Sequence, residues 1–141
     1  MDLASAPLAA RTELSLAPAP DAALAVVQEL LAAFNEHDAD AFAALFAPDA
    51  WFINVLGHRF SGRAEIAAAH RFLFSTVLAE SHATSMDVVS RSLTDDVAVI
   101  EAVWDSAEQT MRQGVMVLVL QRGDAREWTI VQCTNGDYAR P

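Results

Sequence analysis

The chain has 141 residues, and its 9 basic and 19 acidic residues give it a formal net charge of −10. Such an acidic chain repels the phosphate backbone of nucleic acids and offers no basic face to a membrane surface, so we expect neither partner. With 53% hydrophobic and 20% charged residues, it has the apolar content of one folded domain.

Cysteine and histidine usage argues against disulfides and metal sites. The single Cys133 cannot form an internal disulfide, and the histidines at 37, 58, 70 and 82 lack the spacing of a zinc motif. We therefore expect no metal, and nothing in the sequence calls for an organic cofactor. Asp2 stands where a secretory signal carries positive charge, and the longest apolar run, Val115 to Leu120, is far shorter than the roughly 20 residues of a membrane span, which predicts a cytoplasmic protein.

Residues 1–20 mix Ala, Pro, Ser and Leu without sustained periodicity and are interpreted as an N-terminal tail. An ordered tail would have to bury its apolar side chains on the domain or on a second subunit, the candidates being Leu3, Leu8, Leu14 and Leu16. Residues 21–141 then form a single domain.

Three helices are predicted in the first half of that domain. Asp21 is expected to cap the first, whose apolar stripe is Val27, Leu30, Leu31 and Phe34. Asp38 is expected to cap a shorter second helix carrying Phe42, Leu45 and Phe46. Trp51 to Leu56 is typical of a strand, and Gly57-His58 turns the chain back. A third helix starts at Ser61-Gly62, with an apolar stripe of Ile66, Ala69, His70, Leu73, Phe74 and Val77.

The second half predicts long strands joined by hairpin turns: Ser85 to Leu93, Val97 to Asp105, Gln113 to Arg122 and Trp128 to Asp137. Helices followed by a curled antiparallel sheet define an α+β class, in which the helices cover the concave face. Val115, Val117 and Val119 alternate with Met116, Leu118 and Leu120, so both faces of the sheet need a cover. The helices can cover only one, which predicts a homodimer through the other.

Several short motifs occur in an order and spacing that resemble the nuclear transport factor 2-like superfamily. They are Asp38-Ala39-Asp40, Leu45-Phe46-Ala47-x-Asp49-Ala50-x-Phe52, Asn54-x-x-Gly57, Ser61-Gly62-Arg63-x-x-Ile66-x-x-x-His70, and Glu127-Trp128-x-Ile130 with Asn135. The most similar branch is the SgcJ/EcaC type, related to SnoaL-like polyketide cyclases and ketosteroid isomerase. The resemblance covers residues 21–138 and implies a cystatin-like cone, in which a strongly bent sheet wraps around N-terminal helices, encloses a pocket and dimerises.

The resemblance also implies a function class. Members of this branch occur with genes for enediyne and other antibiotics, which implies a small hydrophobic or polyketide-derived ligand. The superfamily holds both enzymes and non-catalytic binders, so fold alone does not choose between them. One departure weakens a transfer of the cyclase mechanism: the last strand reads Thr134-Asn135-Gly136, where the branch usually has His-Asn-Thr, and the cyclases' strand Asp has only Asp105 and Asp137 as candidate matches.

His70 is the candidate catalytic residue, because an imidazole on an apolar stripe can exchange protons near neutral pH; the alternative is a core histidine bonded to a backbone carbonyl. The candidate substrate-binding residues are Trp51, Asn54, His58, Phe74, Trp104 and Asn135. Asn54 could hold a ligand oxygen or only satisfy a strand edge, and His58 could lie at the pocket mouth or only in solvent.

On the strand from Val97 to Asp105, either Trp104 lines the pocket beside the small Ala98 and Ala102, or Glu101 and Asp105 do; the cost of burying two unpaired carboxylates favours Trp104. These residues lead to two functions. In the first, His70 moves a proton next to a carbonyl while Asn54 or Asn135 and the Trp104 indole donate to the oxyanion. In the second, the protein sequesters or presents a hydrophobic intermediate without chemistry.

Overall fold

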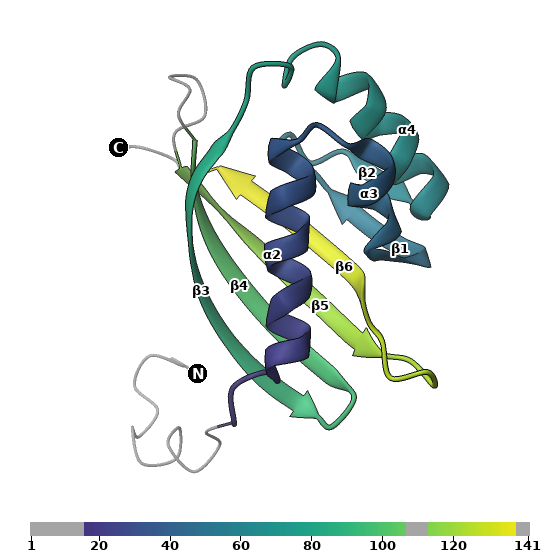
Figure 1. The fold of residues 1–141 in the computed structure, drawn as a ribbon, viewed down its shortest axis with the longest axis vertical. Coiled ribbons are helices and arrows are strands. Elements are labelled where there is room, and N and C mark those ends of the chain that lie inside the picture. Colours follow the sequence, from purple (N-terminus) through teal and green to yellow (C-terminus); the bar gives the residue numbers. More distant parts are fainter. Residues whose placement is uncertain (1–15, 107–112, 138–141) are drawn as a thin grey trace, which may run out of the picture.

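The computed structural model describes residues 16–106 and 113–137. Three helices precede or interrupt a single sheet (Figure 1). The helices are α2 (Asp21–Asn35), α3 (Ala39–Ala44) and α4 (Arg63–Phe74). The strands are β1 (Phe46–Ile53), β2 (Arg59–Ser61), β3 (Ala83–Thr94), β4 (Val97–Ser106), β5 (Gln113–Arg122) and β6 (Trp128–Asp137). The predicted α+β class is confirmed, and the predicted tail residues Leu3, Leu8 and Leu14 lie outside the described part of the chain.

The strands of the described residues form one six-stranded sheet in the order β2-β1-β6-β5-β4-β3. The four long strands pair antiparallel as the turn pattern predicts. The sheet is nevertheless mixed, because β1 pairs parallel to β6. The β1–β2 hairpin therefore extends the sheet at the β6 edge, and its turn lies beside the end of β6.

β1 begins earlier than the sequence predicts. Phe46, expected on the second helix, is the first residue of the strand and is fully buried. Pro48 cannot donate to a strand ladder, but the register of β1 against β6 is irregular between Phe46 and Trp51, and a proline is tolerated at such a position. The strand thus continues through a proline that the sequence pattern interprets as a helix stop.

The sheet curls around α2, which lies in its concave face (Figure 1). Val27 and Leu30 on α2 are buried against the inward rows of the central strands, which include Ile100, Leu118 and Ile130. On β5, the alternation of half-exposed and buried residues places Met116, Leu118 and Leu120 inside and the three valines outside. The core therefore occupies the space between α2 and the inner face of the sheet.

The helix ends follow capping chemistry with two corrections. The Asp38 side chain accepts a hydrogen bond from the Ala41 backbone N–H at 3.0 Å, as expected of an N-cap. Pro20, and not Asp21, is the cap residue of α2, and Asp21 lies in the first turn, where its charge favours the helix dipole. α4 ends at Phe74, so Val77 is not on that helix and its side chain is 72% exposed.

The last residues before α2 run alongside β3. The Ser92 backbone N–H donates to the Ala17 carbonyl at 2.7 Å, and the Ala19 N–H donates to Ser90 Oγ at 3.1 Å. Ala19 is buried, whereas Leu16 is 44% exposed. The placement of the domain boundary after residue 20 stays a prediction, but these bonds cover part of the β3 edge.

Candidate functional site

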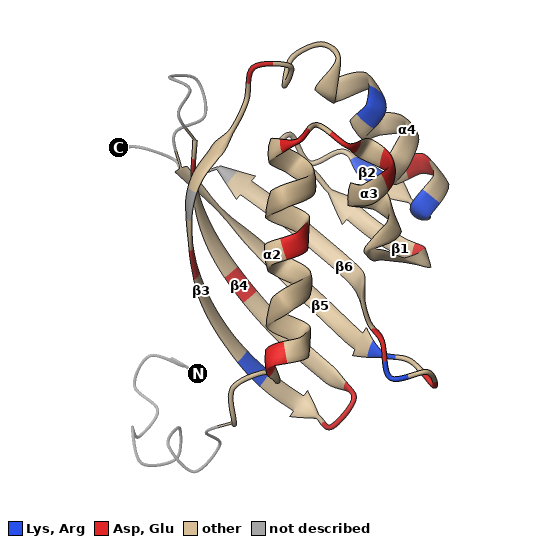
Figure 2. Ribbon diagram, in the orientation of Figure 1, with Lys and Arg blue, Asp and Glu red and all other residues tan. Residues whose placement is uncertain are grey.

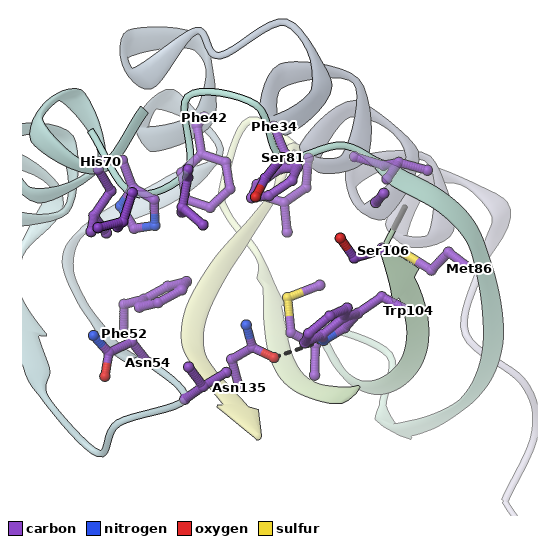
Figure 3. Close-up of a pocket in the computed structure, with 18 of the residues that line it drawn as sticks. Phe34, Phe42, Phe52, Asn54, His70, Ser81, Met86, Trp104, Ser106 and Asn135 are labelled. Atoms are coloured by element: carbon purple, nitrogen blue, oxygen red, sulfur yellow. Dashed lines mark hydrogen bonds between the residues drawn. The ribbon is translucent and has the colours of Figure 1, made fainter. Parts of the chain in front are cut away.

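A cavity of about 200 Å³ lies between the helices and the end of the sheet where β3 begins and β4 and β6 end (Figure 3). Its walls are mostly apolar. α2 contributes Leu30, Leu31 and Phe34, and the sheet contributes Phe52, Met86 and Met116. Such a lining excludes water from most of the space and leaves the few polar side chains to orient a ligand.

His70 projects from α4 into this space and is 3% exposed (Figure 3). Its Nδ1 lies 2.8 Å from the Ile66 carbonyl oxygen, which can only accept, so Nδ1 carries the proton and Nε2 carries a lone pair. Every fully buried side-chain nitrogen or oxygen in the described residues has a hydrogen-bond partner, and Nε2 has none, so Nε2 is open to the cavity. Both sequence interpretations of His70 thus hold at once, one for each ring nitrogen.

Phenylalanines surround the imidazole. The Phe42 ring lies 4.3 Å away at a shallow angle, and the Phe52 ring lies 4.9 Å away, edge to face. Burial among these rings disfavours the charged form and lowers the pKa of His70, against which the hydrogen bond to Ile66 acts in the opposite direction. At neutral pH the residue is therefore a neutral imidazole with an available lone pair.

A second polar group is built from Trp104 and Asn135. The Trp104 indole Nε1–H donates to Asn135 Oδ1 at 2.8 Å (Figure 3). Because an indole N–H can only donate, this bond assigns the amide oxygen to the Trp104 side and leaves the Asn135 Nδ2 hydrogens available to a ligand. The predicted direct donation from the indole to a ligand is therefore wrong, since that hydrogen is already bonded to Asn135.

Gly114 allows the indole to reach Asn135. Trp104 on β4 pairs with Gly114 on β5, and Asn135 lies one strand further, opposite Met116. A Cβ atom at Gly114 would come closer than 3.0 Å to the Trp104 indole and to the Gly136 carbonyl oxygen. The indole thus crosses β5 only because position 114 carries no side chain.

Asn54 also lines the cavity, but its oxygen is engaged elsewhere. Oδ1 accepts hydrogen bonds from the backbone N–H groups of Leu56 and His58, at 3.0 and 2.9 Å. These bonds close the turn between β1 and β2. The amide oxygen therefore holds backbone in place, which corresponds to the structural alternative for this residue.

Three predicted ligand contacts lie outside the cavity. Trp51 neighbours the inward-facing Phe52, so strand alternation turns it to the outer face, where it is 48% exposed and the Arg59 guanidinium stacks over it. His58 is exposed in the turn. Phe74 packs behind His70 against Phe34, at ring distances of 5.6 Å. Leu73, its neighbour on α4, faces the cavity instead.

Several lining residues carry no signal in the sequence. Ser81 and Ser106 come from a connecting segment and a strand end, where no periodicity indicates direction. Met116 is recognisable from the alternation on β5, and Leu30, Leu31 and Phe34 from the helical stripe of α2. These apolar residues set the shape of the cavity, while His70 and Asn135 carry most of its polarity.

Charged side chains are kept away from the cavity. None of the described lining residues is Asp, Glu or Arg, and Asp105 and Glu101 are not among them. Acidic residues lie along α2, at the helix ends and in the hairpin turns (Figure 2). Within residues 16–106 and 113–137, no cluster of three His, Cys, Asp or Glu side chains could hold a metal ion. His70 is therefore the one titratable residue in the described lining.

Comparison with known sequences matches residues 27–131 to the model of the SnoaL-like domain. No curated protein sequence matched the chain. None of the helices in the described residues is long and apolar enough to cross a bilayer.

Solved structures share the fold. A cystatin-like-fold domain of unknown function from Nostoc punctiforme PCC 73102 is 26% identical, with a TM-score of 0.75 over 82% of this chain and 75% of that one. A ketosteroid isomerase-like protein from Erwinia carotovora atroseptica SCRI1043 is 15% identical, with a TM-score of 0.69 over 85% and 96%. Aln2 from a Streptomyces species is 16% identical, with a TM-score of 0.69 over 85% and 93%. The last two likenesses establish the fold alone.

Proposed function

The chain belongs to the SnoaL-like family, and on that premise we propose that it binds a small hydrophobic, polyketide-derived molecule and moves a proton on it without a cofactor. The family generally comprises small-molecule binders and cofactor-free isomerases and cyclases. The polyketide part of the proposal, including an enediyne-type intermediate, is supported by the resemblance to the antibiotic-associated branch. The chemical part is supported by the cavity itself.

The observation that carries the proposal is the state of His70. Its Nδ1 proton is held by the Ile66 carbonyl, and its Nε2 lone pair is open to the cavity. Burial lowers its pKa, which keeps the ring unprotonated at neutral pH. A general base needs this combination of a fixed ring, an available lone pair and a pKa near or below the working pH.

The proposed reaction is a proton shift on a ketone. His70 Nε2 takes a proton from a carbon next to the carbonyl, or conjugated with it, and the C–H electron pair moves onto the carbonyl oxygen. The resulting enolate accepts a hydrogen bond from Asn135 Nδ2. The imidazolium then returns the proton to a carbon of the same conjugated system, which restores the carbonyl and the neutral ring.

The electrostatics of the cavity suit a transient charge pair. An imidazolium alone among phenylalanines is disfavoured by desolvation, but the enolate formed in the same step offsets that cost in a low-dielectric site. Asn135 is already oriented by Trp104 and needs no reorganisation when the negative charge develops. The base and the donor come from α4 and β6, on different sides of the cavity (Figure 3).

Deuterium exchange tests this proposal. We expect the protein to catalyse exchange of the C2 protons of α-tetralone in D₂O, followed by NMR, and His70→Gln to lower the enzymatic rate by about 100-fold or more. Gln keeps a side-chain N–H that can reach the Ile66 carbonyl. His58→Gln is the matched control, because His58 is exposed and outside the cavity. Circular dichroism checks that both variants fold, and exchange unchanged in a folded His70→Gln variant would refute the role of His70.

A non-catalytic binding function is the second candidate, and one observation favours it. The described lining offers His70 as its one titratable group, so this lining holds no second acid to deliver a proton. A binder would bind α-tetralone and return it without exchange above the buffer rate. The exchange experiment therefore separates the two functions, provided that binding is measured in the same sample.

A further inference from the structure

We infer the chemical class of the ligand group that occupies the cavity: an uncharged system of one or two fused rings that bears a hydrogen-bond acceptor, such as a ketone, directed at Asn135. This inference rests on the proposed function, since it specifies the ligand of the same site. It concerns binding alone and does not require that His70 act as a base.

The volume sets the size of the group. The cavity measures about 200 Å³. A dry engineered cavity of about 150 Å³ binds a single benzene ring, and sites for drug-sized ligands span about 300–1,000 Å³. The space therefore suits one or two fused rings rather than a larger polycyclic ligand. Aromatic side chains at several points of the wall, among them Phe34, Phe42 and Trp104, favour a ring over a flexible chain.

The mouth allows the rest of a larger molecule to remain outside. Leu56 and Val77 line the cavity, yet they are 75% and 72% exposed. Residues that are both lining and exposed mark the opening. A ligand can thus insert a ring-sized group and leave its remaining part against this apolar rim or in solvent.

The lining selects against charge. It contains no Asp, Glu or Arg among the described residues, and His70 is neutral at neutral pH because burial lowers its pKa. An ammonium or carboxylate entering this space would lose its hydration without gaining an ion pair. The inserted group is therefore uncharged.

The fixed amide selects an acceptor. Because the Trp104 N–H holds Asn135 Oδ1, the amide cannot rotate to present its oxygen without breaking a hydrogen bond. It presents Nδ2 hydrogens, which a ketone oxygen can accept and a hydrocarbon cannot. A ring without an acceptor would leave this donor desolvated and unpaired, which costs binding free energy.

Calorimetric binding of three matched bicyclic compounds to the full chain tests the inference: α-tetralone, tetralin and the carboxylate of tetralin-1-carboxylic acid. We expect α-tetralone to bind about tenfold tighter than tetralin, and the carboxylate at least about 100-fold weaker than the ketone. Asn135→Leu should bring α-tetralone to within about twofold of tetralin while leaving tetralin binding nearly unchanged.

The controls separate this inference from the proposed function. Thr134→Val alters the neighbouring residue of β6, which is exposed and outside the cavity, and should leave the ratio unchanged. His70→Gln should keep the preference for the ketone although it loses exchange. Equal affinities of ketone and hydrocarbon, a carboxylate as tight as the ketone, or no binding of any of the three would each overturn the inference, whatever the exchange experiment shows.

Discussion

Gly114→Ala should be far more costly than an added methyl group usually is on a strand. The new Cβ would lie closer than 3.0 Å both to the Trp104 indole and to the Gly136 carbonyl oxygen, so either the indole or the backbone of β6 must move. Overpacking of this kind costs about 1–3 kcal/mol. Moving the indole also breaks its bond to Asn135, which is worth about 0.5–1.5 kcal/mol. We expect the free energy of unfolding to fall by about 2–4 kcal/mol.

Gly136→Ala is the matched control for this prediction. A Cβ at Gly136 meets only the Val115 carbonyl oxygen, at the ordinary contact distance of 3.9 Å. Its effect should stay below about 1 kcal/mol. Urea unfolding followed by far-UV circular dichroism gives both values. If Gly114→Ala proves as stable as Gly136→Ala, the indole does not cross β5 at this point and the assignment of the Asn135 amide loses its basis.

Three further predictions concern charge, assembly and capping. The lowered pKa of His70 means that the unfolded chain binds more protons below about pH 6.5, so unfolding free energy should decrease as pH falls through that range, and His70→Gln should reduce the slope in urea titrations. The half-exposed valines on the outer face of β5 predict a homodimer of about twice 15.2 kDa by light scattering, and Val117→Glu should yield the monomer; a wild-type monomer at micromolar concentration would contradict it. Asp38→Ala should cost about 1 kcal/mol in thermal or urea unfolding, and no measurable loss would show that the cap bond to Ala41 contributes nothing.

Local sequence patterns predict most of the fold. The alternation on β5 and the helical stripe of α2 set the direction of their side chains, and the bounds of β5 and β6 agree with the turn signals. Trp104 is predicted on the inner face because Ala98 and Ala102 share its row, and both alanines are buried. These features depend on residues close in sequence, so periodicity and turn chemistry suffice for them.

The features that sequence patterns miss depend on pairing between distant segments. The Trp104–Asn135 bond needs the registers of β4, β5 and β6 together with a glycine at one position, and no local pattern encodes that. Phe74 and Leu73 are both apolar residues at the end of α4, and only the packing of α4 on α2 decides that Leu73 faces the cavity. Trp51 is different, because alternation from Phe52 already directs it outward and its assignment to the ligand site is wrong on local grounds alone.

Cys133 gives the chain an internal reporter of how often its sheet opens. It is the single cysteine, it is fully buried on β6 between the strands that carry the core, and burial raises the pKa of its thiol. A thiol in that state does not react with alkylating reagents until local or global opening exposes it. The labelling rate of the unmodified chain therefore measures the opening of the strand that also holds Asn135, and a ligand that bridges β6 to the helices would slow it.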